Sequence, residues 1–204
     1  MTYAQLEQET GHKKTDLRIV KTHRLIKDAF RRLLAREEYT KITVTAVANE
    51  AQINRKTFYA HFNSVEDLLA SFLHDQVSEI FANSDVPEEG EPAEGRIRRL
   101  TRLFLEALEH SLEIEENLLR NVPITWLVDQ MRKPLCEKVA QIRRDAERPV
   151  SERMEYYIDC YVTCILSTFL LWRERVNAGS DSETIDDLVD IVMAFVSGKP
   201  EAEL

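Results

Sequence analysis

Few of the features that commonly carry enzyme chemistry are present in this 204-residue chain. It contains five glycines and no Gly-rich phosphate loop. Its histidines, cysteines and carboxylates show neither the spacing of metal ligands nor a paired nucleophile and base. These absences argue against an enzyme, and we expect no cofactor and no bound metal.

Cysteines and long apolar runs are also scarce. The three cysteines are an odd number without the spacing of a disulfide framework. Cys160 and Cys164 lie four residues apart in an apolar stretch and are expected to pack as small hydrophobes, with a redox sensor as the alternative. The first 15 residues are polar and no apolar run is long enough to cross a bilayer. We therefore expect no signal peptide, no membrane partner and a cytoplasmic location.

Charge is unevenly placed along the chain, whose net charge is -9. Residues 1–65 contain 12 Lys+Arg and 7 Asp+Glu, whereas the remainder contains 15 and 29. This pattern excludes a uniformly basic nucleic-acid coat. A basic beginning on an acidic body fits a protein that lays one end on phosphates, although mild segregation also arises by chance.

The first helix is expected over about residues 16–36. Its apolar stripe, at close to a 3.6-residue period, comprises Ile19, Ile26, Ala29, Phe30 and Leu33. Eight basic residues lie between Lys13 and Arg32 and face mainly away from that stripe. They indicate either a solvated helix face or contacts with a DNA backbone, which require only loose geometry.

Residues 43–69 carry the most information. Thr43 is a good N-cap for a second helix whose buried face is Val44, Val47, Ala48 and Ala51. A turn follows at residues 52–54, where Ile53 is expected in the core and Asn54 as the cap of the next helix. Ser64 then caps a fourth helix, with Asp67 at its third position in an arrangement like a capping box.

The third helix presents cationic and hydrogen-bonding side chains on few residues. Phe58 and Phe62, four apart, mark its buried side, and Lys56 and Ala60 fall nearly opposite. Lys reaches guanine acceptors or phosphate, Ala meets a thymine methyl, and hydroxyls bond phosphate. The pattern is typical of a helix-turn-helix DNA reader. The predicted DNA-binding residues are Thr43, Thr45, Asn54, Arg55, Lys56, Thr57, Tyr59, Ala60 and His61.

The rest of the chain reads as helical, with no convincing strand. An acidic loop is expected over residues 83–95, and Pro123, Pro134 and Pro149 are expected to break the middle of the chain. A long apolar helix is predicted over residues 151–176, ended by 177–179, and a last helix starts at 181 or 182. The sequence thus predicts an all-α protein with a flexible arm (1–15), a helix-turn-helix domain (16–63) and a helical body (64–204).

The segment from about Arg18 to Leu69 resembles the TetR/AcrR family of bacterial regulators. The resemblance is carried by residues 39–44, 47–48, 51–62 and 64–69, and the Thr-Phe-Tyr-x-His-Phe run at 57–62 is its most specific part. It implies a three-helix head on a larger helical body for ligand binding and dimerisation, and a homodimer that binds a pseudo-palindromic operator on double-stranded DNA. Most members repress transcription and some activate it.

Three positions depart from the family pattern. Glu38 stands where the family usually has Gly after the first helix, a residue favoured there because it accepts positive φ. Gln52 replaces a Gly in the turn, which predicts a more strained turn. Val65 replaces a Lys, which removes an expected phosphate contact.

Function in the body is predicted less sharply. The candidate residues lining a pocket for a small-molecule effector are Phe104, Trp126, Met131, Tyr156, Tyr157 and Cys160. It is at least as well expected that each of these residues belongs to the hydrophobic core or to the dimer interface. The predicted dimer interface is Tyr161, Ile165, Thr168, Trp172, Leu188, Val192 and Phe195. The favoured function is a repressor released by a ligand. The alternatives are an architectural DNA-binding protein without a ligand switch and, less favoured, a helical enzyme or carrier.

Overall fold

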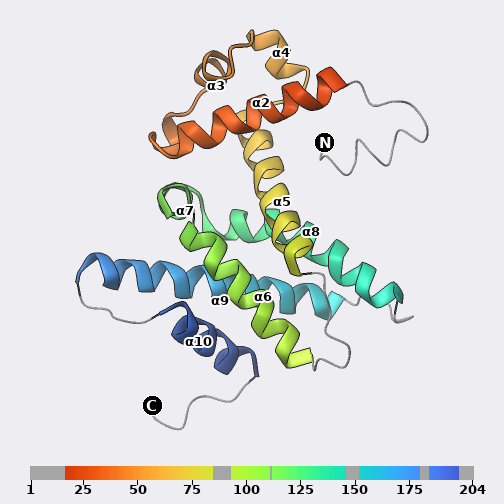
Figure 1. Cartoon of the computed structure of the whole chain (residues 1–204), viewed down its shortest axis with the longest axis vertical. Helices are drawn as coiled ribbons and strands as arrows, with labels where there is room; N and C mark the ends of the chain where they lie inside the picture. The colour runs from red at the N-terminus through yellow and green to blue at the C-terminus, as the bar shows by residue number, and fades with distance from the viewer. Residues whose placement is uncertain (1–16, 85–92, 111, 146–151, 180–183, 198–204) are drawn as a thin grey trace. The chain divides into compact units, whose positions relative to one another are not determined.

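The computed structural model describes residues 17–84, 93–110, 112–145, 152–179 and 184–197 (Figure 1). All regular structure in these ranges is helical, which confirms the all-α prediction. The elements are α2 (Leu17–Leu34), the 3-10 helix η1 (Tyr39–Lys41), α3 (Val44–Glu50), α4 (Arg55–Tyr59), α5 (Val65–Ser84), α6 (Ala93–His110), α7 (Leu112–Asn121), α8 (Ile124–Asp145), α9 (Glu152–Asn177) and α10 (Ile185–Ser197). The predicted arm, residues 1–15, lies outside the described residues.

The chain divides into two compact units. The first contains the described residues up to Gln76 together with Glu113–Val122, and the second contains Val77–Leu112 and the chain from Pro123 onward. Most of α7 therefore belongs with the first unit, although both its chain neighbours belong to the second. The functional boundaries predicted at 15/16 and 63/64 remain a prediction.

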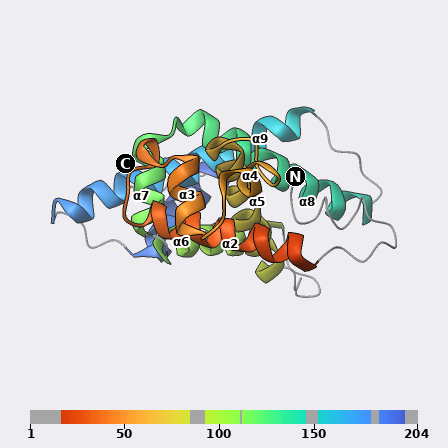
Figure 2. The same cartoon turned by 90° about the horizontal axis from the view of Figure 1, so that it is seen from above.

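In the first unit, α3 packs against α2 and against α4 (Figures 1 and 2). The predicted stripe of α2 is buried from Ile26 to Leu33, as expected. Ile19 is an exception, since its side chain is exposed. The first buried residue of α2 among those described is His23, so the opening turns of the helix lie outside the core.

Lys27 corrects the expectation that the basic residues of the first helix face away from the core. Its side chain is buried, its Nζ donates a hydrogen bond to the Ser71 carbonyl at 3.0 Å, and it forms an ion pair with Asp75 of α5. The buried cation thus joins α2 to α5 rather than facing solvent. Burial lowers the pKa of Lys27, and the Asp75 carboxylate opposes that shift.

In the second unit, α9 packs against α8, α6 and α10, and α6 packs against α10. The buried apolar residues of this unit include Leu105, Val162, Phe169 and Val189. Arg132 of α8 forms a two-pronged hydrogen bond with Asp159 of α9, at 2.6 and 2.7 Å. Arg98 and Arg102 of α6 pair with Asp190 and Asp186 of α10, so ion pairs border two of these helix contacts.

The predicted break at Pro134 is wrong, because α8 runs through it. A proline inside a helix removes one backbone hydrogen bond and crowds the preceding turn. Pro134 and its neighbour Leu135 are buried, as is Met131, and this apolar packing offsets the lost bond. At Pro123 the prediction holds, since α8 begins directly after it. Pro149 lies outside the described residues.

Other helix limits differ by a few residues from those expected. The acidic loop predicted over 83–95 is helical at both ends, because α5 continues to Ser84 and α6 begins at Ala93. The end of α9 is as predicted, and Gly179 there has a φ of 70°. The last helix begins later than expected: Thr184 bonds with Asp187 at the start of α10, as a capping residue does.

Candidate nucleic-acid interface

The two short helices of the first unit begin with the caps that the sequence predicts. The Thr43 hydroxyl accepts a hydrogen bond from the Ala46 N–H at 3.1 Å, and the Asn54 Oδ1 accepts one from the Thr57 N–H at 2.8 Å. A third cap, Ser64, accepts from the Asp67 N–H at 3.0 Å at the start of α5. These bonds satisfy backbone donors that a helix start leaves without a partner, and they set where α3, α4 and α5 begin.

A Schellman motif forms the turn between α3 and α4. The N–H of Ile53 bonds to the Ala48 carbonyl at 2.9 Å, and the N–H of Gln52 bonds to the Asn49 carbonyl at 3.1 Å. Gln52 has a φ of 55°, a left-handed conformation in which glycine is favoured. This supports the predicted strain at Gln52. Ile53 is only half-buried and not fully in the core as expected.

Glu38 does not adopt the positive φ that is expected at a position where the family usually has glycine. Its φ is -58° and its ψ is 134°, an extended geometry that any residue adopts. The end of the first helix therefore carries no left-handed strain at this position. The expectation derived from the family pattern does not apply to this residue.

Two aromatic side chains, one in α4 and one three residues after it, hold this part of the chain to the core. Phe58 and Phe62 are fully buried, with ring centroids 5.9 Å apart, and Phe62 packs on the buried ring of His23 at 4.6 Å. With this side buried, Arg55, Lys56, Tyr59 and Ala60 lie on the exposed side, and Tyr59 is 49% exposed. These four residues belong to the predicted DNA-binding set and form an exposed strip that is available to a partner.

Two members of the predicted set have hydrogen bonds inside the protein. The Thr57 hydroxyl lies 3.1 Å from the Asn54 Oδ1 and donates its proton to that oxygen. It therefore has no hydroxyl proton to give a phosphate while the cap is intact. Asn54 itself acts as the cap, and its Nδ2 group remains the polar part that can face outward. Thr43 and Thr45 are exposed near the start of α3.

His61 differs from the exposed cations of α4. It is half-buried, its ring centroid lies 6.0 Å from that of His23, and burial lowers its pKa. A neutral imidazole contacts DNA as a hydrogen-bonding group and not as a cation. The cationic part of the strip is therefore Arg55 and Lys56.

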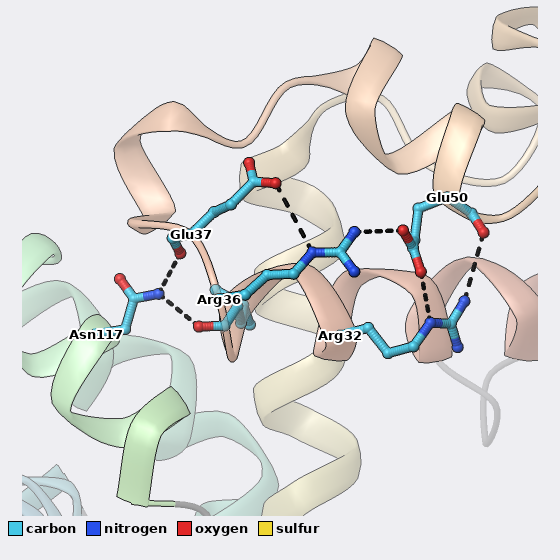
Figure 3. Close-up of polar contacts among 6 residues, drawn as sticks. Arg32, Arg36, Glu37, Glu50 and Asn117 are labelled. Carbon is cyan, nitrogen blue, oxygen red and sulfur yellow. Dashed lines mark hydrogen bonds and ion pairs between the residues drawn. The ribbon is translucent and has the colours of Figure 1, made fainter.

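A carboxylate between two arginines fastens the end of α3 to α2 (Figure 3). Glu50 accepts a hydrogen bond from Arg32 Nε at 2.6 Å and pairs with Arg36 on its other oxygen. These hydrogen bonds, that from Arg32 first, lower the pKa of Glu50. Both guanidinium groups stay about half exposed, and Arg36 also pairs with Glu37, so the two arginines are balanced by two carboxylates.

Most of the basic residues of α2 remain on its surface. Arg18, Lys21 and Arg24 are exposed along the first half of the helix, and Arg31 is exposed with its guanidinium 5.2 Å from the Phe72 ring centroid. Lys13 and Lys14 lie outside the described residues. The exposed members stay candidates for phosphate contacts, whereas Lys27 is excluded by its burial.

Comparison with known proteins agrees with this geometry. Residues 26–72 match the family model described as bacterial regulatory proteins, tetR family. Two curated relatives from Bacillus subtilis (strain 168) are the uncharacterized HTH-type transcriptional regulators YxbF and YuxN. They are 24% identical over 79% of this chain and 29% identical over 60% of it. The matches span 41% and 43% of those two proteins, so under half of the length of each relative is covered.

Solved structures share the fold over most of the chain. A putative TetR-family regulator from Syntrophomonas wolfei has a TM-score of 0.64 and 17% identity, covering 90% of this chain and 97% of its own. A TetR transcriptional regulator from Streptococcus agalactiae has a TM-score of 0.60 and 24% identity, covering 89% and 96%. These likenesses concern the fold.

The capped helices, the turn and the exposed strip define a helix-turn-helix protein, and the matches identify the kind. Residues 26–72 match the helix-turn-helix domain of the TetR family of regulators. This match confirms the predicted resemblance over these residues.

The residues predicted to line an effector pocket differ in burial, because some lie in the core and others on the surface. Phe104 and Met131 are buried, and Trp126 is half-buried. In contrast, Tyr156 is 72% exposed, and Tyr157 and Cys160 are also exposed. Cys160 therefore does not pack as a small hydrophobe within the chain. The pocket as a set remains a prediction.

The predicted dimer residues are mostly covered by the chain itself. Ile165, Trp172, Leu188 and Val192 are buried, Tyr161 and Thr168 are half-buried, and Phe195 is 71% exposed. The Tyr161 hydroxyl lies 2.9 Å from the buried Thr101 hydroxyl of α6. Burial raises the pKa of Tyr161 to about 12. The buried members of this set pack within the second unit, and the role of the set between subunits remains a prediction.

Proposed function

We propose that this protein is a sequence-specific transcriptional regulator that binds a pseudo-palindromic DNA operator as a homodimer. The observation that carries the proposal is the exposed strip of Arg55, Lys56, Tyr59 and Ala60 on a short helix whose other side is fixed by buried Phe58 and Phe62. A rigid helix with exposed donors near its N-terminus is the geometry that reads base edges in the major groove.

The proposed contacts with DNA are of two kinds, contacts with base edges and contacts with phosphates. Arg55 and Lys56 offer donors to the guanine O6 and N7 acceptors, and Ala60 offers a methyl group to thymine. Tyr59 and Thr43 offer hydroxyl groups to phosphates, which position the helix without reading sequence. This division separates residues that set base preference from residues that set overall strength.

Dimerisation is supported by large apolar side chains left exposed on α9 and α10, two helices that pack on each other. They are Leu171, Ile191, Phe195 and Val196, and Leu171 is 57% exposed. Apolar side chains gathered on neighbouring helices mark an interaction surface, and a second copy of the chain is the proposed occupant. Of the predicted interface residues, Phe195 belongs to this exposed set.

The dimer proposal is tested by sedimentation equilibrium. Phe195→Glu places a charge in the proposed seam and is expected to give monomers. The matched control is Glu106→Lys, an exposed position on α6 outside the seam, which should stay dimeric. A wild-type chain that sediments as a monomer at all accessible concentrations would rule out this interface.

Repression is the proposed mode, since a dimer that occupies a promoter blocks transcription without a further contact. Relatives in fold include a fatty acid degradation regulator from Bacillus halodurans and a dihydroxyacetone kinase operon activator. A small-molecule effector in the second unit would release DNA by binding one of two states more tightly, with a typical coupling of about 1–3 kcal/mol.

With DNA as its partner, the protein is proposed to act in the cytoplasm. No helix of the described part is long and apolar enough to cross a membrane.

DNA binding itself is tested by selecting bound fragments from a random duplex pool with the wild-type protein. The expected product is an inverted repeat whose half-sites lie about 10 base pairs apart, one helical turn. Binding should weaken steeply as salt is raised, because phosphate contacts release counterions. Recovery of no enriched sequence would count against the proposed function.

A further inference from the structure

Asn117 of α7 uses every hydrogen-bonding position of its side-chain amide. Its Nδ2 donates to the Leu34 carbonyl at 2.7 Å and to the Glu37 carbonyl at 2.6 Å (Figure 3). Its Oδ1 accepts from the Tyr39 N–H at 2.9 Å and from the Asn121 Nδ2 at 3.0 Å. An amide has two donors and two acceptor sites, so Asn117 is fully satisfied in this one orientation.

The partners of Asn117 are backbone groups where two helices stop and start. Leu34 is the last residue of α2, and Tyr39 is the first residue of η1. Carbonyls at a helix end and N–H groups at a helix start lack partners within their own helix. One side chain, about 80 positions away in sequence, therefore caps both ends of the loop from Ala35 to Glu38.

This loop leads into the helix-turn-helix through Thr43, the cap of α3. The far end of α3 is fastened by Glu50, which pairs with Arg32 of α2 and with Arg36 of this same loop. The loop therefore contacts the C-terminus of α3 through Arg36 and is tied to α7 by Asn117. The direction of α4 follows from α3 through the short turn at residues 51–54.

We infer that Asn117 is a positioning residue for DNA binding, which holds the loop before α3 while touching no DNA itself. The inference rests on the proposed function for its DNA part. It also gives α7 a role that the sequence-based division, which assigned residues 64–204 to the body, does not contain. Residues 113–122 group with the first unit, so Asn117 and the loop that it caps belong to the same unit.

The test compares Asn117→Asp with Asn121→Ala. Asp keeps the shape and the acceptor but replaces both donors, so a carboxylate faces two carbonyl oxygens. Asn121 is the matched control because its Nδ2 bonds only within α7, to the Asn117 carbonyl at 2.8 Å and to the Asn117 Oδ1. Two quantities are measured: amide hydrogen exchange of residues 35–42, and affinity for selected and for random duplex DNA.

Asn117→Asp should speed exchange across residues 35–42. It should also weaken binding to the selected sequence on the order of tenfold while changing binding to random DNA by less than about twofold. Asn121→Ala should stay close to wild type in both measurements. If Asn117→Asp does not fold, Asn117→Ser, which keeps one donor, takes its place with the same measurements.

Unchanged exchange in residues 35–42 would overturn the inference, as would an equal loss of selected and random binding, which marks a general loss of folded protein. If the wild-type protein selects no sequence, the proposed function fails and so does the DNA role of Asn117. The exchange measurement, which needs no DNA, then still decides whether Asn117 holds the loop.

Discussion

Lys27 and Asp75 join α2 to α5 through an ion pair in which the lysine is buried and the carboxylate is partly exposed. The Lys27 Nζ also donates a hydrogen bond to the Ser71 carbonyl at 3.0 Å. A buried cation with two partners ties the helix that supports the DNA reader to the helix that follows it. Because the lysine is buried more deeply than the carboxylate, removing one partner should affect stability differently from removing the other.

Removing Asp75 should cost more than removing Lys27. Asp75→Ala leaves a buried ammonium without its counter-charge and should lower the free energy of unfolding by about 2 kcal/mol, below the full penalty of a deeply buried pair because Asp75 is partly solvated. Lys27→Met keeps the aliphatic stem and should cost about 1 kcal/mol or less. Urea unfolding measures both, and an equal or reversed order would contradict this account of the pair.

His23 makes stability depend on pH. Burial, followed by the charge of Lys27 and the neighbouring His61 and opposed by Asp75, lowers the pKa of His23 from 6.5 to about 4. Between these values the unfolded chain binds a proton that the folded chain does not. The free energy of unfolding should therefore fall as pH drops from 6.5 towards 4, by at most about 3 kcal/mol.

The comparison that isolates this effect is wild type against His23→Leu. Among the residues that the structure describes, none forms a hydrogen bond with the buried His23 Nε2 atom, so an apolar side chain loses little there. The variant should keep the acid titration of the carboxylates and lose the part due to His23. Equal pH profiles of unfolding for the two proteins would show that His23 is not the cause.

The strain at Gln52 should be relieved by glycine. Gln52→Gly removes the Cβ penalty at a φ of 55° and should raise the free energy of unfolding by about 0.5–1 kcal/mol, even after the greater chain entropy of glycine. Ala60→Gly is the matched control, because Ala60 has a φ of -72° and should lose stability. A loss of stability at both positions would contradict the strain.

Asn54 should matter as a cap more than as a DNA contact. Asn54→Ala removes the acceptor for the Thr57 N–H and should lower the free energy of unfolding by about 1 kcal/mol. Asn54→Asp keeps that acceptor and should keep the stability. Thermal unfolding distinguishes the two, and equal losses would mean that the amide acts through another contact.

The features that could be predicted from sequence are local ones. Thr43, Asn54 and Ser64 cap helices as expected, because a capping bond spans only three residues and is independent of the rest of the fold. The strain at Gln52 was predicted from the resemblance, because the family usually has Gly at this position of the turn. Helical periodicity likewise identified the buried side of α4, marked by Phe58 and Phe62.

The features that could not be predicted depend on distant parts of the chain. Lys27 looked like one of several surface cations, and its partner Asp75 lies 48 positions further on. Asn117 carries no local signal, since its partners lie about 80 positions away. Apolar periodicity on α9 also could not separate residues that pack within the chain, such as Ile165, from exposed ones such as Leu171.

The most direct test of the proposed reading helix is base preference measured on single variants of α4. On the selected operator and all its single-base changes, Arg55→Ala and Lys56→Ala should flatten the preference at the bases they contact, where each correct pair contributes about 1–3 kcal/mol. Tyr59→Ala should weaken binding to every sequence alike. An unchanged preference profile in both cationic variants, with wild-type affinity retained, would contradict the claim that this helix reads the DNA.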